Sequence, residues 1–218
     1  METTRRPIKA RDTEWAKSIA RRLLHLGLKP NQVSILSSVF GCGAGIMFWL
    51  SGIRCCAAGV YLSLVAAAIF IQLRLLCNLF DGMLAVEGGL KSKSGELYNE
   101  LPDRISDLGT LVGAGFGVAY LPYGITLGWI AGSLAVLTAY IRTLGAAAGA
   151  PHFFVGPCAK QQRMAIMTAA AVLACVEYYF HASTWTIWVA LMLIALGSVV
   201  TCFRRLKLIA TFLEANAS

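Results

Sequence analysis

Long apolar segments are the feature that most constrains this chain. Most of them reach the roughly 20 residues that a helix needs to cross a hydrocarbon core about 30 Å thick. Six can be read, at residues 32–51, 55–80, 105–122, 124–149, 164–181 and 184–203. With 57% hydrophobic and 14% charged residues and a mean hydropathy of +0.67, the composition excludes an ordinary soluble protein. The chain is predicted to be an all-α integral membrane protein.

The third segment is apolar only in its second half, because charged side chains occupy its beginning. We predict a helix that starts near Gly95 and whose polar first half is shielded by neighbouring helices. This gives six transmembrane helices in one domain, residues 32–210, followed by a C-terminal tail, residues 211–218. Residues 1–31 are predicted to form a cytoplasmic basic arm and an amphipathic helix that lies in the membrane interface. A solvated basic arm with no more specific role is the alternative for this N-terminal region.

The basic residues predict the orientation of the chain. If residues 1–31, the 86–95 loop, the 150–163 loop and the C-terminus share one side, 18 of the 19 Lys and Arg residues lie on or near that side. The positive-inside rule then places both termini in the cytoplasm and the protein in the cell (inner) membrane. The formal net charge of +8 indicates attraction to anionic lipid headgroups rather than to nucleic acid.

Acidic residues are concentrated in one part of the chain. Six of the eleven Asp and Glu residues lie within residues 81–107. Asn78 and Asp81 are three residues apart and Asn99 and Asp103 four apart, so each pair shares a helix face. Two antiparallel helices joined by a short polar loop would bring these faces together. Because carboxylate and amide oxygens are ligands of hard divalent cations, the pattern predicts a metal site that opens to the cytoplasm and suits a phosphorylated substrate.

A second polar cluster precedes the fifth apolar segment. Lys160 and Arg163 are three residues apart, with Arg142 at the end of the preceding segment, so on a helix the first two would hold a phosphate together. Ordinary cytoplasmic basic residues are the alternative. The small residues Gly82, Ala85 and Gly95 would leave room for a flat ring or a ribose beside the metal.

The stretch around the acidic residues resembles the signature of the CDP-alcohol phosphotransferase family, D-x-x-D-G-x-x-A-R, about eight residues, then G-x-x-x-D-x-x-x-D. In this chain the matching positions, with the same spacing, are Asn78, Asp81, Gly82, Ala85, Val86, Gly95, Asn99 and Asp103. Pro30 and Asn31, with Ser34, resemble the P-N-x-x-T that begins the first span in the family.

The resemblance implies a homodimeric membrane enzyme. Such an enzyme transfers a phosphatidyl group from CDP-diacylglycerol to a small polar alcohol and releases CMP. The alcohol is phosphorylated if Lys160 and Arg163 form an acceptor site. The implied ligands of one or two Mg²⁺ or Mn²⁺ ions are Asn78, Asp81, Asn99 and Asp103. Asp103 would also deprotonate the acceptor, and the implied nucleotide-binding residues are Asn31, Gly82, Ala85 and Gly95.

This chain departs from the signature at three positions. Asn78 and Asn99 keep a coordinating oxygen but remove two negative charges, so affinity for a pair of metal ions should fall. Glu96 or Glu100 would restore a carboxylate if either side chain turns inward. Val86 stands where the signature has Arg.

Arg74 and Arg104 are candidates to replace the missing Arg of the signature. The departures leave open a different class of function, a catalytically silent lipid- or nucleotide-binding homologue that acts as a membrane scaffold. Asp81 and Asp103 argue against it, because they retain a metal ligand and a base. A transporter is a more distant alternative, since the charged cluster lies at one membrane surface rather than midway.

Overall fold

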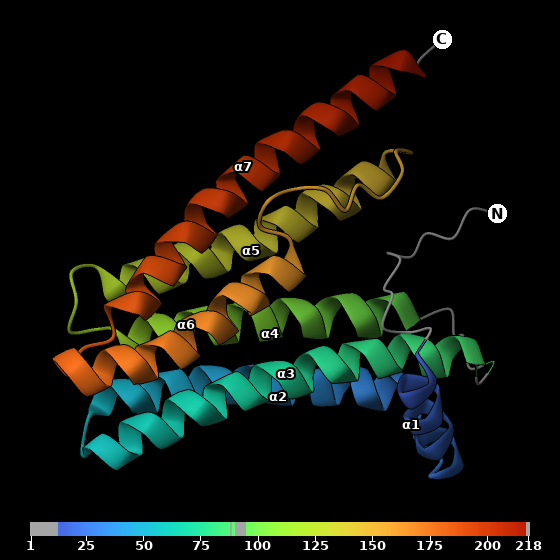
Figure 1. Ribbon diagram of the computed structural model, residues 1–218. Helices are drawn as coiled ribbons and strands as arrows, with labels where there is room; N and C mark the ends of the chain where they lie inside the picture. The colour runs from blue at the N-terminus through green and yellow to red at the C-terminus, as the bar shows by residue number, and fades with distance from the viewer. Residues whose placement is uncertain (1–12, 88, 90–94, 217–218) are drawn as a thin grey trace.

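The computed structural model describes residues 13–87, 89 and 95–216, and this part of the chain is built from helices (Figure 1). The helices are α1 (Glu14–His25), α2 (Pro30–Ile53), α3 (Ala57–Glu87), α4 (Gly95–Gly117), α5 (Gly124–Ala147), α6 (Lys160–His181) and α7 (Trp185–Ala215). The predicted all-α fold is confirmed. Five helices, α2, α3, α5, α6 and α7, are long and apolar enough to cross a membrane. The polar first half of α4 keeps it outside that group, so the count of six spans stays a prediction.

Six helices form a closed ring of neighbours. Going round the ring, α2 packs against α4, α4 against α5, α5 against α7, α7 against α6, α6 against α3, and α3 against α2. In Figure 1, α1, the end of α3, the start of α4 and the ends of α5 and α7 all lie at the same end of the molecule. The predicted acidic and basic clusters are therefore brought to one end of the ring.

Glycine lets α2 and α4 approach each other closely. A Cβ atom added at Gly113 would overlap the backbone of Gly45, and one added at Gly45 would overlap the backbone of Gly109. The spacing of small residues on both helices thus serves backbone-to-backbone packing, which stabilises helix pairs in lipid through van der Waals contact. This close pair fixes the position of α4, which carries half of the predicted site.

Helix α1 packs across α3. Ala16 and Ala20 are fully buried against it in a cluster with Phe80 and Leu84, and Trp15 meets the Phe80 ring edge-on with centroids 6.4 Å apart. The remaining apolar side chains of α1 are partly exposed, Trp15 the most. The structure has a helix at Glu14–His25, and that it is an amphipathic helix in the membrane interface stays a prediction.

At the other end of the ring, Arg54 in the turn between α2 and α3 contacts residues of three other segments. Its guanidinium lies over the Tyr120 ring at 4.4 Å and the Tyr178 ring at 5.5 Å, and it donates to the carbonyl of Ala182. These contacts link the α2–α3 turn to the α6–α7 turn. The carboxylate of Glu177 accepts hydrogen bonds from the first backbone N–H groups of α7, where the helix dipole favours a negative charge.

Candidate active site

Asp81 of α3 and Asp103 of α4 are both buried, and each is about 6% exposed. They lie close enough for their charges to influence each other. Helix α2 supplies a third group, because the hydroxyl of Ser34 donates to Oδ2 of Asp81 at 2.8 Å. Both carboxylates are therefore buried on helices that flank α2, and the first turns of α2 support one of them.

Basic side chains surround Asp103. Lys160, the first residue of α6, makes an ion pair with its Oδ1. Arg104 lies 3.7 Å from Oδ2, and Arg74 of α3 lies 4.0 Å from Oδ1. A residue predicted to bind phosphate and the residue predicted to act as base are thus direct partners.

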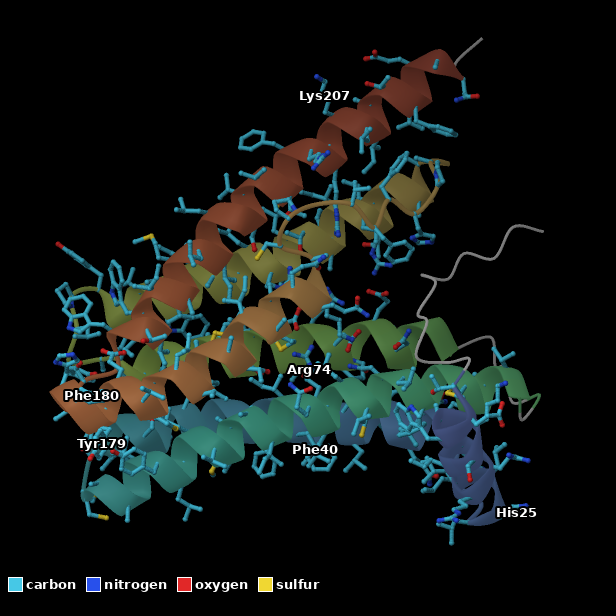
Figure 2. The ribbon with its side chains drawn as sticks, in the orientation of Figure 1. His25, Phe40, Arg74, Tyr179, Phe180 and Lys207 are labelled. Atoms are coloured by element: carbon cyan, nitrogen blue, oxygen red, sulfur yellow. The ribbon has the colours of Figure 1, made fainter. Side chains whose placement is uncertain are left out.

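Asp107 is completely buried between two guanidinium groups (Figure 2, which labels Arg74). Arg74 donates to its Oδ1 at 2.5 Å and Arg163 to its Oδ2 at 2.7 Å. Arg163 also donates to the hydroxyl of Thr138 at 3.2 Å and to the carbonyl of Cys158 at 2.7 Å. Because a buried charge is costly unless paired, this network fixes α3, α4, α5 and α6 relative to one another.

Arg163 was predicted to bind a phosphate together with Lys160, and its contacts bear on that role. Its side chain is 1% exposed and already bonded to Asp107, so its contacts are structural ones. Arg74 is likewise engaged with Asp107, although it also reaches the backbone carbonyl of Asp103 at 3.4 Å. Sequence reasoning did not foresee this arginine pair, and its only signal was the position of Asp107 one helical turn after Asp103.

Glu100 faces the neighbouring helix α5. Its carboxylate lies 2.5 Å from Arg142 and 3.6 Å from Arg104. Arg142 also lies over the ring of Phe154, at 5.1 Å from the centroid. Glu100 therefore neutralises a basic pair, and no contact joins it to Asp81 in the described part of the chain. The side chain of Glu96, the other candidate carboxylate, lies outside the described residues.

The two amides of the signature differ in their surroundings. Asn99 lies on the exposed side of α4, whereas Asn78 is partly buried. The Nδ2 atom of Asn78 is buried without a hydrogen-bond partner among the described residues. Buried polar atoms are normally paired, and the amide can present either its oxygen or its nitrogen, so this side chain is available to a metal ion or a phosphate oxygen.

The oxygens present fit a divalent cation, because carboxylates and an amide are hard ligands. They are few, however. Within the described residues, no three His, Cys, Asp or Glu side chains gather as a metal-binding group. The site thus offers Asp81, Asp103 and the Asn78 amide, with Asn99 nearby on the exposed face of α4.

The predicted nucleotide-binding residues lie around these oxygens. Gly82 and Ala85 follow Asp81 on α3 and are partly buried. Asn31 lies one turn before Ser34 on α2 and so shares the face that contacts Asp81. Gly95 begins α4.

Relatives of known function share most of this chain, although no family model matches it. It is 27% identical over 201 residues to the phosphatidylinositol phosphate synthase of Mycobacterium marinum, covering 88% of this chain and 78% of the relative. It is 26% identical over 159 residues to the archaetidylinositol phosphate synthase of Pyrococcus horikoshii, covering 73% and 77%.

The crystal structure of Mycobacterium tuberculosis phosphatidylinositol phosphate synthase in complex with manganese and citrate superposes with a TM-score of 0.75. The match covers 90% of this chain and 89% of that one at 25% identity. The fold is that of a phosphatidylinositol phosphate synthase. The same enzyme with CDP-DAG bound superposes with a TM-score of 0.74 at 24% identity. The synthase fold and the apolar helices make this chain an integral membrane protein. The manganese in the first structure supports the predicted divalent metal.

Proposed function

We propose that this chain is a CDP-alcohol phosphotransferase that moves a phosphatidyl group from CDP-diacylglycerol to a small polar alcohol and releases CMP. The observation that carries the proposal is the burial of two signature carboxylates, Asp81 held by Ser34 and Asp103 held by Lys160, at one end of the helix ring. Both occupy signature positions, and the phosphatidylinositol phosphate synthases share the fold around them. We further propose that the site faces the cytoplasm, as the distribution of basic residues indicates. We also propose that the enzyme is a homodimer, as the family resemblance implies.

The reaction forms a bond between the acceptor oxygen and the phosphorus of the phosphatidyl group, and breaks the bond from that phosphorus to the oxygen that leaves with CMP. A divalent ion bound at Asp81 and Asn78 would supply neutralisation of the diphosphate charge. Asp103 would accept the proton of the acceptor hydroxyl. Lys160 and Arg104, held at its two oxygens, keep that carboxylate in position and add positive charge for the phosphates.

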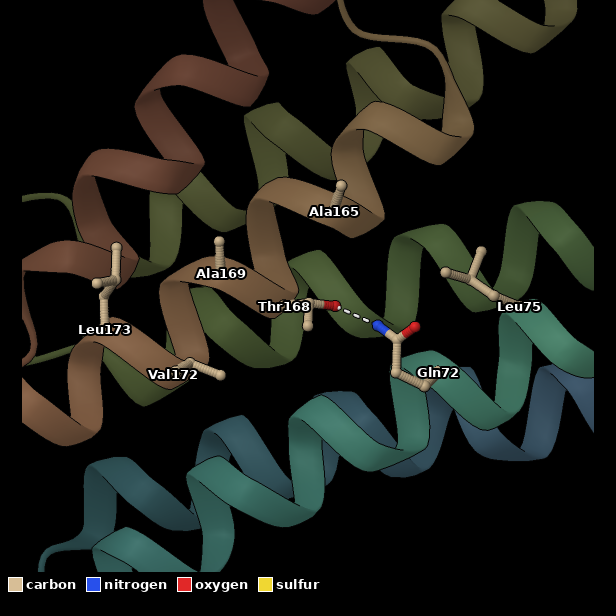
Figure 3. A pocket seen from close by; sticks show the side chains of 7 residues that line it. All are labelled: Gln72, Leu75, Ala165, Thr168, Ala169, Val172 and Leu173. Carbon is tan, nitrogen blue, oxygen red and sulfur yellow. Dashed lines mark hydrogen bonds between the residues drawn. The ribbon is translucent and has the colours of Figure 1, made fainter.

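A groove between α3 and α6 suits the lipid part of the donor (Figure 3). Its volume is about 560 Å³, and its walls include Leu75, Val172 and Leu173. Gln72 donates to the hydroxyl of Thr168 at 2.8 Å across the groove. Because α6 begins at Lys160 in the polar cluster, a headgroup bound there would place a hydrocarbon chain along this groove.

The acceptor is proposed to be a phosphorylated polyol. The relatives are named for products that contain inositol phosphate, and this chain gathers basic side chains beside Asp103. Arg142 and Arg104 are the groups best placed to bind a phosphate, because their partner Glu100 is partly exposed and can be displaced. Arg163, which was predicted for this role, is committed to Asp107.

Release of CMP tests the proposal. Purified full-length protein in lipid nanodiscs is expected to release CMP from CDP-diacylglycerol when Mn²⁺ and a phosphorylated polyol are both present. The Asp103→Asn variant should lose this activity, whereas Glu214→Gln, on the exposed end of α7, should keep it. Failure to release CMP with a panel of phosphorylated and neutral polyols would favour the silent scaffold.

A further inference from the structure

We propose that the site binds a single divalent ion, and that the ammonium group of Lys160 takes the place of a second cation beside Asp103. This inference deepens the proposed function, since it rests on the same metal-dependent site. It concerns the distribution of positive charge across the two carboxylates, Asp81 and Asp103.

The first argument is the asymmetry between the two carboxylates. Asp103 has cationic partners at both oxygens, Lys160 at Oδ1 and Arg104 at Oδ2. In the described part of the chain no Lys or Arg forms an ion pair with Asp81, whose Oδ2 accepts from the neutral hydroxyl of Ser34. The Asn78 amide with its unpartnered Nδ2 lies one turn before Asp81 on the same helix. Asp81 can therefore still bind a metal ion, whereas both oxygens of Asp103 already have cationic partners.

The second argument is the charge of the cluster. Its described members are six basic and four acidic side chains: Arg74, Arg104, Arg142, Lys160, Arg163 and Arg205, and Asp81, Glu100, Asp103 and Asp107. Aspartates at positions 78 and 99 would bring the acidic groups to the same number as the basic ones. With asparagine at both positions the cluster is net positive before any metal binds. A second divalent ion would add repulsion in a buried site with little to offset it.

The third argument is that the helix carrying Lys160 holds its ammonium group in place. Lys160 is the first residue of α6, which packs against α3 and lies across the ring from α4, and its side chain, 22% exposed, reaches Asp103 from there. Arg163, one turn later, anchors this end of α6 to Asp107. The position of the ammonium group is therefore set by the fold, and it persists when the donor enters from the membrane.

Manganese binding to the purified full-length protein in nanodiscs tests the inference, with electron paramagnetic resonance counting the bound ions. The wild type is expected to bind one Mn²⁺ per chain with the spectrum of an isolated ion. Lys160→Gln removes a competing positive charge and should tighten Mn²⁺ binding about tenfold, the size of effect expected for one nearby charge. Lys160→Arg, which keeps the charge, should bind one ion with wild-type affinity, as should the matched surface control Lys207→Gln.

A triple variant, Asn78→Asp with Asn99→Asp and Lys160→Gln, restores the carboxylates and removes the ammonium group. It is expected to bind two ions whose spins are coupled. Two coupled ions in the wild type would overturn the inference, and so would unchanged or weaker Mn²⁺ binding in Lys160→Gln protein that elutes as folded on size exclusion. The proposed function is tested separately from this inference. If the protein binds one ion but releases no CMP, the proposed function is wrong and the inference stands. If the protein releases CMP and binds two coupled ions, the inference is wrong and the proposed function stands.

Discussion

Asp107 is the residue on which the polar interior depends most. Its carboxylate is fully buried and balances Arg74 and Arg163, so Asp107→Asn leaves two buried guanidinium groups without their counter-charge. We expect the free energy of unfolding to fall by about 3 kcal/mol or more. Thermal unfolding in detergent measures the loss, with Glu214→Gln as the exposed control. Adding Arg163→Met to Asp107→Asn should recover part of the stability, and no recovery would contradict the ion-pair explanation.

At the same scale, the sequence predicted some site contacts and missed others for a definable reason. Asp81 and Asp103 lie near the joined ends of successive helices, so helical spacing predicted that they lie at the same end of the molecule. The contacts of Ser34 with Asp81 and of Lys160 with Asp103 join helices far apart in the chain. They depend on how α2 packs against α3 and how α6 reaches α4, which residue spacing does not encode.

The link between helices α4 and α5 gives a prediction about the acceptor. Glu100 occupies Arg142 and Arg104, so Glu100→Gln should free both for a phosphate. We expect the KM for a phosphorylated acceptor to fall about threefold to tenfold, since one charged competitor is removed. The KM for a neutral polyol should stay unchanged. Steady-state CMP release with each acceptor measures this. A matched loss of kcat with both acceptors would instead identify Glu100 as a metal ligand.

The close approach of helices α2 and α4 gives a second prediction among the elements. A Cβ at Gly113 would overlap the Gly45 backbone, so Gly113→Ala must push the two helices apart. We expect a loss of about 1 to 3 kcal/mol in stability, the usual cost of overpacking. Gly59→Ala on α3 is the control, because its nearest neighbour is the Cys56 sulfur at 3.3 Å. Equal melting temperatures for the two variants would contradict the packing role.

Helix ends show what hydropathy reports and what it omits. The last apolar segment was placed at residues 184–203 and the tail at residues 211–218, and α7 runs from Trp185 to Ala215. Arg204, Arg205 and Lys207 lie within α7, because basic residues are good helix formers although they lower the hydropathy of a segment. Hydropathy therefore locates the apolar part of a helix rather than the whole helix.

For the whole molecule, composition predicted the class and the order of helices, but the order of neighbours in the ring came from the structure. Nothing in an apolar segment states which other segment it will contact, because lipid and a neighbouring helix are similarly apolar. The glycine positions were the exception, since small residues mark the faces where backbones meet. The pairing of α3 with α6, which creates the groove of Figure 3, had no such marker.

The orientation of the whole molecule is testable through its own cysteines. Cys55 and Cys56 are exposed in the α2–α3 turn, at the end of the ring opposite Asp103. If the site faces the cytoplasm, a membrane-impermeant maleimide should label them in intact cells whose outer barrier admits the reagent. Cys158, at the site end, is buried, and burial raises the pKa of its thiol, which lowers the thiolate fraction that reacts. Cys55→Ser with Cys56→Ser should abolish labelling, as mass spectrometry of the protein would show. Labelling that appears only after the membrane is permeabilised would mean the opposite orientation, and would place the site end, with Lys160 and Arg163, outside the cell.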